Sequence, residues 1–145
     1  MTQRLAEHVG PAGKVYAVDI QPRMLELLRD SMRQHGITNV EPVLGAVDDP
    51  KLPKNAIDLI LLVDVYHEFS EPQKMLRHMS EALKPDGRLV LLEYRGEDPA
   101  VPIRPEHKMT IAQVKTELEP EGFRLAETIE SLPRQHILIF RKNIH

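Results

Sequence analysis

Ionisable side chains gather in residues 64–69, directly after the apolar run Ile57–Val63. This stretch contains Asp64, His67 and Glu68. Imidazole titrates near neutral pH and can take a proton from a reacting group, so His67 is the first candidate for a general base. An alternative is equally open at this point: Asp64 would cap the following turn, and His67 would be a surface residue.

Carboxylates also follow two earlier stretches with strand character. Asp19 lies at the end of Lys14–Ile20, which is rich in β-branched and aromatic residues. A carboxylate there can accept two hydrogen bonds from a ribose diol, with the apolar Ile20 against a base, or it can cap a helix. Asp48 follows the strand-like run Val40–Leu44. It could accept a hydrogen bond from an exocyclic amine or belong to a solvated acidic turn.

The elements that must position these residues follow from periodicity and from turn residues. We predict strands at residues 14–20, 40–44, 57–63, 88–94, 123–129 and 135–141, and helices at residues 2–9, 22–34, 70–83 and 110–121. Ser70 and Gln73 are expected to form a capping box, and Pro85–Gly87 a turn. Because ligands bind at the carboxyl ends of the strands in open α/β sheets, the polar residues after the strands are the candidate site.

This order of elements predicts one α/β domain spanning residues 1–145. Its sheet should be mostly parallel, with a C-terminal antiparallel β-hairpin. The formal net charge of −3 provides no basic surface, so bulk nucleic acid is not an expected partner. The absence of cysteine excludes disulfides and thiolate metal sites. No apolar run approaches a membrane span, and a cytoplasmic location is expected, although a longer parent could carry a signal upstream.

Four motifs, in this order, resemble the class I S-adenosylmethionine-dependent methyltransferases. KVYAVDIQPRML is similar to that family's second-strand acidic motif, and LGAVDDPKLP to its adenine-side loop. IDLILLVDVYHEF is similar to its fourth strand, and LKPDGRL to the turn before its fifth strand. The resemblance covers essentially the whole chain. It implies a Rossmann-like fold, S-adenosylmethionine as cofactor, and methyl transfer to a small-molecule acceptor.

The resemblance also implies roles for individual residues at the adenosine end of the cofactor. Asp19 would bind the ribose hydroxyls, and Ile20 would pack on the adenine. Ala46 and Val47 would line the adenine, with Asp48 as the acceptor for its amine.

At the methionine end, the resemblance places Val63 and Asp64 near the cofactor. The family's first strand and glycine-rich loop would precede Thr2. We therefore expect an N-terminally truncated chain that lacks both. Two strands would then lack a neighbour, and their exposed edges could support a homo-oligomer.

His67 is the expected catalytic base, and His107 could reach over the site from a proline-rich interval. Glu68, Glu93 and Arg95 are weaker candidates. The other histidines are expected at the surface, namely His8, His35, His78, His136 and His145. No set of histidines and carboxylates has a convincing metal-ligand spacing, so no metal site is predicted.

Two alternatives to a methyltransferase stay open. Asp19 would also suit the ribose of NAD(P), although no G-x-G-x-x-G motif is present. The chain could also be a non-catalytic remnant of a methyltransferase. Binding of S-adenosylhomocysteine would distinguish these possibilities.

Overall fold

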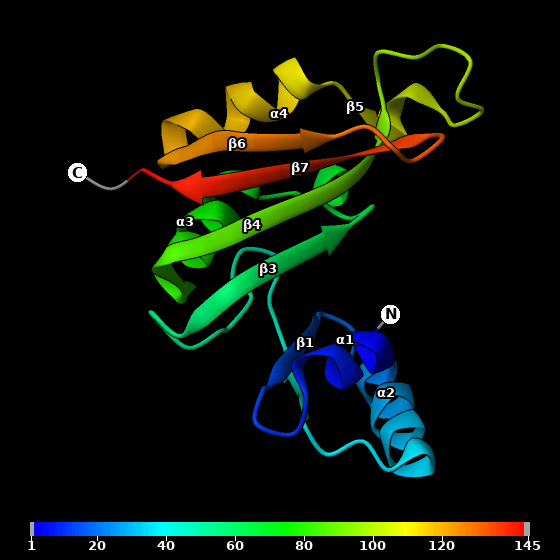
Figure 1. Ribbon diagram of the computed structural model, residues 1–145, viewed down its shortest axis with the longest axis vertical. Coiled ribbons are helices and arrows are strands. Elements are labelled where there is room, and N and C mark those ends of the chain that lie inside the picture. The colour runs from blue at the N-terminus through cyan, green and yellow to red at the C-terminus, as the bar shows by residue number, and fades with distance from the viewer. Residues whose placement is uncertain (1, 144–145) are drawn as a thin grey trace. The chain divides into compact units, whose positions relative to one another are not determined.

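The computed structural model describes residues 2–143, apart from the side chain of Gln3. The chain divides into two compact units, Met1–Leu52 and Pro53–His145, and each is described by itself (Figure 1). The prediction of a single domain stays a prediction.

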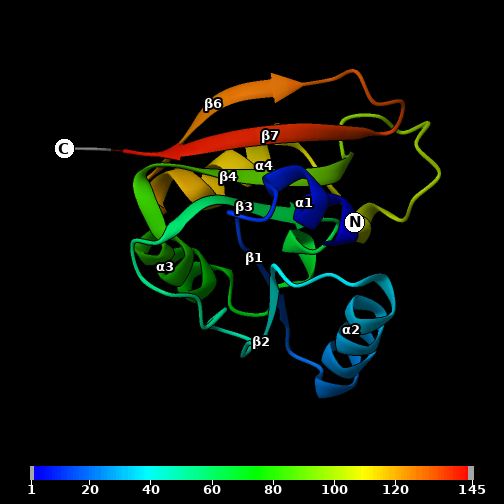
Figure 2. The same ribbon diagram turned by 60° about the horizontal axis from the view of Figure 1, so that its bottom comes forward.

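The first unit combines two helices with a pair of parallel strands. Its elements are α1 (Thr2–Val9), β1 (Val15–Asp19), α2 (Pro22–His35) and β2 (Val40–Leu44). β1 and β2 run side by side, as Figure 2 shows, with Val15 opposite Val40 and Asp19 opposite Leu44. Pro22 suits the first turn of α2 because its ring fixes φ near the helical value. Gly36 ends that helix at φ 65°, a left-handed conformation that glycine adopts at little cost.

The second unit contains a mixed sheet with strand order β3-β4-β7-β6. β3 is parallel to β4, whereas β7 is antiparallel to both β4 and β6. The strands are β3 (Ile57–Val63), β4 (Leu83–Arg95), β6 (Phe123–Ile129), β7 (Gln135–Lys142) and the short β5 (Lys108–Met109), which pairs with the end of β4. The helices are α3 (Pro72–Ala82), α4 (Ile111–Leu118) and the 3₁₀ turns η1 (Tyr66–Glu68), η2 (Pro105–His107) and η3 (Glu119–Glu121).

The core of the second unit lies on one face of this sheet. Alternate residues of a strand point to the same face of the sheet, and residues paired across neighbouring strands also point to that face. The fully buried pairs between β4 and β7 are Leu89–Phe140, Leu91–Leu138 and Glu93–His136. Buried side chains of α3 and α4 belong to the same core, namely Leu76, Met79, Val114 and Leu118. The apolar row along the two strands therefore ends in a buried polar pair.

The predicted order of helices and strands is confirmed, including the antiparallel terminal hairpin. A capping box begins α4, since Thr110 Oγ1 accepts a hydrogen bond from the Gln113 backbone N–H at 3.0 Å. Among residues 2–143, β1 forms strand pairs only with β2, and β3 forms them only with β4. Each of β1 and β3 therefore has one edge without a strand neighbour, as expected. Truncation before residue 1 stays a prediction.

Four local predictions are wrong. The capping box at Ser70 is absent: the residue before α3 is Glu71, and no side chain caps this helix. The helix ends at Ala82, because Leu83 is already extended and begins β4. Pro85–Gly87 forms no separate turn but an irregularity within β4, which advances five residues while β3 advances two. His136 is 1% exposed, because strand alternation places it with Leu138 on the core face.

Among the described residues, no helix has both the length and the apolar character needed to cross a membrane.

Candidate active site

A sharp turn at the end of β3 leads the chain into the candidate site. Asp64 has φ 53°, a region that few residues other than glycine adopt and that aspartate tolerates better than most. Its backbone N–H donates to the Leu92 carbonyl at 2.8 Å. Its carboxylate accepts two hydrogen bonds from the Gln135 amide, at 3.0 and 2.8 Å. Asp64 therefore anchors the turn to β7, and it does not cap η1, whose preceding residue is Val65.

The next residues along η1 bring His67 onto the buried Glu93 of β4. His67 Nδ1 lies 2.8 Å from Glu93 Oε2, and the His67 backbone N–H donates to Glu93 Oε1 at 3.3 Å. The Glu93 side chain is 0% exposed and that of His67 is 8% exposed. Burial raises the pKa of the Glu93 carboxyl, while the hydrogen bonds and charge of His67 lower it.

The protonation state of Glu93 decides which nitrogen of His67 is available for chemistry. The backbone N–H of His67 can only donate, so Glu93 acts as an acceptor. With Glu93 ionised, Nδ1 of His67 carries the hydrogen and Nε2 carries the free lone pair. A buried carboxylate can orient a histidine ring in this way. The structure thus gives His67 the geometry of a general base.

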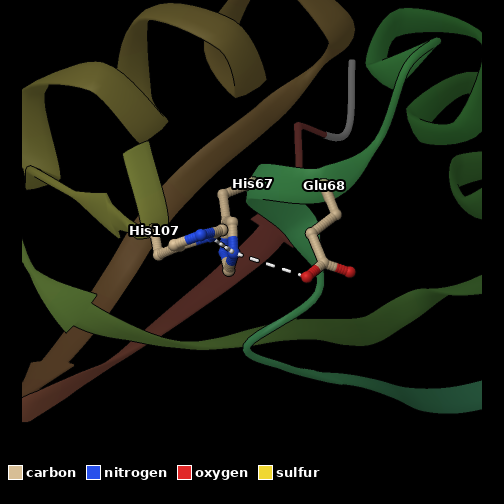
Figure 3. Close-up of side chains that lie close together, drawn as sticks. All are labelled: His67, Glu68 and His107. Carbon is tan, nitrogen blue, oxygen red and sulfur yellow. Dashed lines mark hydrogen bonds and ion pairs between the residues drawn. The ribbon is translucent and has the colours of Figure 1, made fainter. Parts of the chain in front are cut away.

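Two further ionisable groups lie at Nε2 of His67 (Figure 3). His107 Nδ1 is 3.4 Å from this nitrogen, and the two rings meet edge to face. Glu68 Oε1 is 3.8 Å from it. His107, expected to reach over the site, is therefore brought directly against His67 by η2.

A pocket of about 260 Å³ opens beside His67 within the second unit. It is lined by Tyr66, His67, Phe69, Pro72, Pro105, Glu106, Lys108, Met109, Gln113 and Glu117. Its walls combine aromatic, proline and methionine side chains with a few charged groups. This composition is typical of pockets for small organic molecules, in which apolar walls hold the ligand and polar groups orient it.

Sequence reasoning missed Tyr66 and Glu117, which join η1 to α4. The Tyr66 hydroxyl donates to Glu117 Oε1 at 3.0 Å, and Tyr66 is only 2% exposed. Burial and the neighbouring Glu117 raise the pKa of Tyr66 well above its ordinary value. A usable signal was the spacing of Gln113 and Glu117, which puts both on one face of α4.

In the first unit, the residues expected at the adenosine end follow adjacent strand ends. The Gly45 backbone N–H donates to the Asp19 carbonyl at 2.9 Å, which joins the loops after β1 and β2. A Cβ atom on Gly45 would lie 2.8 Å from Val18 Cγ1, so this close approach requires glycine. Ala46 and Asp49 exchange backbone hydrogen bonds and form a tight turn.

Polar and apolar groups at these strand ends remain accessible. Asp19 Oδ1 accepts a hydrogen bond from the Gln21 backbone N–H at 2.9 Å, which leads into α2, and Oδ2 can still accept from a hydroxyl. Ile20 and Val47 are 52% and 54% exposed, which leaves apolar surface for a flat base. Asp48 lies in the same turn, half-buried. Asp19 does not cap α2, whose N-cap is Gln21 without a side-chain cap, and its role at a ribose stays a prediction.

Other ionisable candidates have structural roles or lie apart from the pocket. The Arg95 guanidinium bonds to Glu130 and to backbone carbonyls of the loop between β6 and β7. His8 and His35 are exposed in the first unit, whereas His145 lies outside the described residues. His136 is buried opposite Glu93, and its Nε2 has no hydrogen-bond partner among the described residues.

Comparisons with known proteins agree on one family. A family model described as a methyltransferase domain matches residues 1–135. A ubiquinone/menaquinone biosynthesis C-methyltransferase, UbiE, from Pasteurella multocida is 31% identical, covering 94% of this chain and 54% of the relative. The same enzyme from Salmonella arizonae is 36% identical, covering 65% of this chain and 38% of the relative. The chain therefore spans about half or less of the length of these relatives.

Solved structures agree with this assignment. A SAM-dependent methyltransferase from Aquifex aeolicus superposes with a TM-score of 0.87 at 28% identity, covering 95% of this chain and 73% of that one. The [4+2]-cyclase SpnF superposes with a TM-score of 0.81 at 17% identity, covering 99% of this chain and 71% of that one, which shows a shared fold alone. The predicted fold class and the expected cofactor, S-adenosylmethionine, agree with these similarities. This chain belongs to the methyltransferase domain family and has its Rossmann-like class I fold.

Proposed function

We propose that the protein transfers a methyl group from S-adenosylmethionine to a small aromatic acceptor that carries an ionisable hydroxyl group, such as a hydroquinone. The observation that carries this proposal is the His67–Glu93 pair, which orients the His67 ring beside a pocket with both apolar and polar lining residues. The names of the relatives, which place them in quinone biosynthesis, support an acceptor of this class.

The cofactor, when bound, supplies an electrophilic methyl group on its sulfonium. On the protein, Asp19 and Ile20 would hold the ribose and one face of the adenine. Ala46, Val47 and Asp48 would complete the adenine side. Val63 and Asp64 would lie toward the methionine end.

His67 would act on the acceptor and not on the cofactor. Nε2 takes the proton of the acceptor hydroxyl, and Glu93 stabilises the imidazolium that results. The oxyanion that remains raises electron density at the oxygen and at the adjacent ring carbons, so either atom can attack the methyl group. The displacement itself loses charge, so the rest of the catalytic effect comes from alignment of the two reactants.

The pocket supports a planar acceptor. Phe69, Pro72 and Met109 provide apolar contact for a ring. Tyr66 packs edge to face on Phe69, with ring centres 5.5 Å apart, which keeps that wall in place. Lys108 also lines the pocket, and its ammonium group donates to the Asp98 carbonyl at 3.1 Å.

The test combines calorimetry with a methyl-transfer assay on substituted hydroquinones and catechols. We expect the unmodified chain to bind S-adenosylhomocysteine and to add one methyl group to a member of the panel. Replacing His67 by alanine should lower kcat/KM by about 10²- to 10⁴-fold, the usual contribution of a general base. Its affinity for S-adenosylhomocysteine should stay unchanged.

The matched control is His35→Ala, which removes an exposed histidine in the first unit and should leave the rate unchanged. Full activity in the His67 variant would show that the base is elsewhere. A folded chain that does not bind S-adenosylhomocysteine would reject the enzymatic proposal for this chain.

A further inference from the structure

We propose that His67, His107 and Glu68 bind a divalent transition-metal ion of the zinc type. The proposal does not depend on methyl transfer. It assigns a metal site where the sequence pattern predicted none, because two of the ligands are adjacent along the chain and the third comes from η2, 40 residues from His67.

The spacing of the ligand atoms fits a tetrahedral ion. Two nitrogens that each lie about 2.0–2.1 Å from a tetrahedral zinc are about 3.3 Å apart. His67 Nε2 and His107 Nδ1 are 3.4 Å apart. Glu68 Oε1 lies 3.8 Å from His67 Nε2, and all three ligand atoms are within 4.8 Å of one another. Figure 3 shows the three side chains lying close together, with dashed lines from His67 to the other two.

The environment of His67 supports the same conclusion independently of these distances. Histidines that bind metals usually donate their other ring N–H to a carboxylate, which orients the ring and makes it a better ligand. His67 Nδ1 lies 2.8 Å from Glu93 Oε2, and Glu93 is completely buried. The lone pair of Nε2 is thereby directed to the gap that His107 and Glu68 share.

The exposed fractions of the ligand side chains differ in a way that suits ion entry. The His67 side chain is 8% exposed and held by Glu93, whereas the Glu68 side chain is 63% exposed. The exposed Glu68 side chain therefore has room to move toward an ion held by the two histidines. Three protein ligands leave a fourth position for water, as in zinc sites built from two histidines and one glutamate.

The ligand set also selects the class of ion. Two imidazoles and one carboxylate suit zinc, cobalt and nickel, whereas magnesium and calcium prefer oxygen ligands alone. The chain has no cysteine, so no thiolate competes for the ion. A bound ion occupies the lone pair of Nε2, so ion binding and proton transfer through His67 exclude each other.

The experiment uses the full chain without a histidine tag, freed of metal by a chelator. Titration with Zn²⁺ by calorimetry and with Co²⁺ by visible absorption should show one equivalent bound, with the absorption bands of tetrahedral cobalt and no thiolate charge-transfer band. His107→Ala and Glu68→Ala should each weaken Co²⁺ binding at least tenfold. Glu93→Gln should weaken it about 10- to 100-fold by loosening His67.

His35→Ala and His8→Ala are the matched controls, because both remove exposed histidines of the first unit and should bind Co²⁺ as the unmodified chain does. His107→Ala and Glu68→Ala replace exposed side chains, so they test the site even if the buried Glu93 variant fails to fold. Unchanged Co²⁺ affinity in His107→Ala, or no stoichiometric binding by the unmodified chain, would overturn the proposal. Neither readout uses S-adenosylhomocysteine or an acceptor. A failure to bind metal would therefore reject the metal site without deciding whether the protein transfers methyl groups.

Discussion

The two units of the chain bury their apolar side chains to very different extents. In the second unit, the strands β4 and β7 and the helices α3 and α4 supply more than half of the buried apolar residues of the described chain, and most of the others also belong to this unit. In the first unit, the buried apolar residues are Ala6, Leu25 and Pro50. Most of the large apolar side chains that are exposed belong to this unit, namely Val9, Val18, Ile20, Met24, Leu27, Leu44 and Val47.

The candidate site residues differ between the units in the same way. In the second unit, His67 is held by side-chain hydrogen bonds to a buried carboxylate. In the first unit, Asp19 is held mainly by backbone contacts, and the apolar groups beside it are exposed. If the proposed function is correct, the acceptor side in the second unit is preformed, and the cofactor side in the first unit has apolar surface that a ligand would cover. Ligand binding should therefore change the first unit more than the second.

The largest effect is expected at Asp19. Asp19→Ala removes the acceptor of two charge-assisted hydrogen bonds to the ribose, together worth about 3 kcal/mol or more, or about 100-fold in affinity. Calorimetric titration with S-adenosylhomocysteine should then detect no binding. Asp30→Ala, which removes another exposed carboxylate of this unit, is the control and should bind normally. An unchanged affinity for Asp19→Ala would mean that the ribose lies elsewhere.

A matched pair of leucine substitutions tests the difference in burial directly. Leu91→Ala removes a side chain that is 0% exposed in β4 and should lower the free energy of unfolding by about 2–5 kcal/mol. Leu27→Ala removes one that is 49% exposed in α2 and should change it by less than about 0.5 kcal/mol. Urea denaturation followed by circular dichroism measures both. Equal losses would show that the exposed face of the first unit is covered in solution.

The same difference explains what the sequence could predict. The helices and strands follow local periodicity, so their order and the placement of Asp19 at the end of a strand were accessible. The contacts of the acceptor side were not, because they join residues far apart in the chain. Glu93 is 26 residues from His67, and Glu117 is 51 residues from Tyr66. Only the register of β4, β7 and their neighbours brings such pairs together.

His136 shows the limit most clearly. Histidine is usually found at least partly exposed, so a surface position was the natural expectation. His136, Leu138 and Phe140 are alternate residues of β7, however, and therefore point to the same buried face. This alternation places His136 in the core opposite Glu93. The apolar pattern of residues 137–140 was visible, but it runs through every position and does not reveal which face is buried.

The smallest expected effect concerns the link between η1 and α4. Tyr66→Phe removes the hydroxyl that donates to Glu117 but keeps the buried ring and its contact with Phe69. The loss of one hydrogen bond to a carboxylate should lower the free energy of unfolding by about 1–2 kcal/mol. Glu117→Gln keeps an acceptor for the Tyr66 hydroxyl and should lower it by less. If both variants were as stable as the unmodified chain, this hydrogen bond would not hold the pocket wall, and the acceptor side would be less preformed than the comparison of the two units implies.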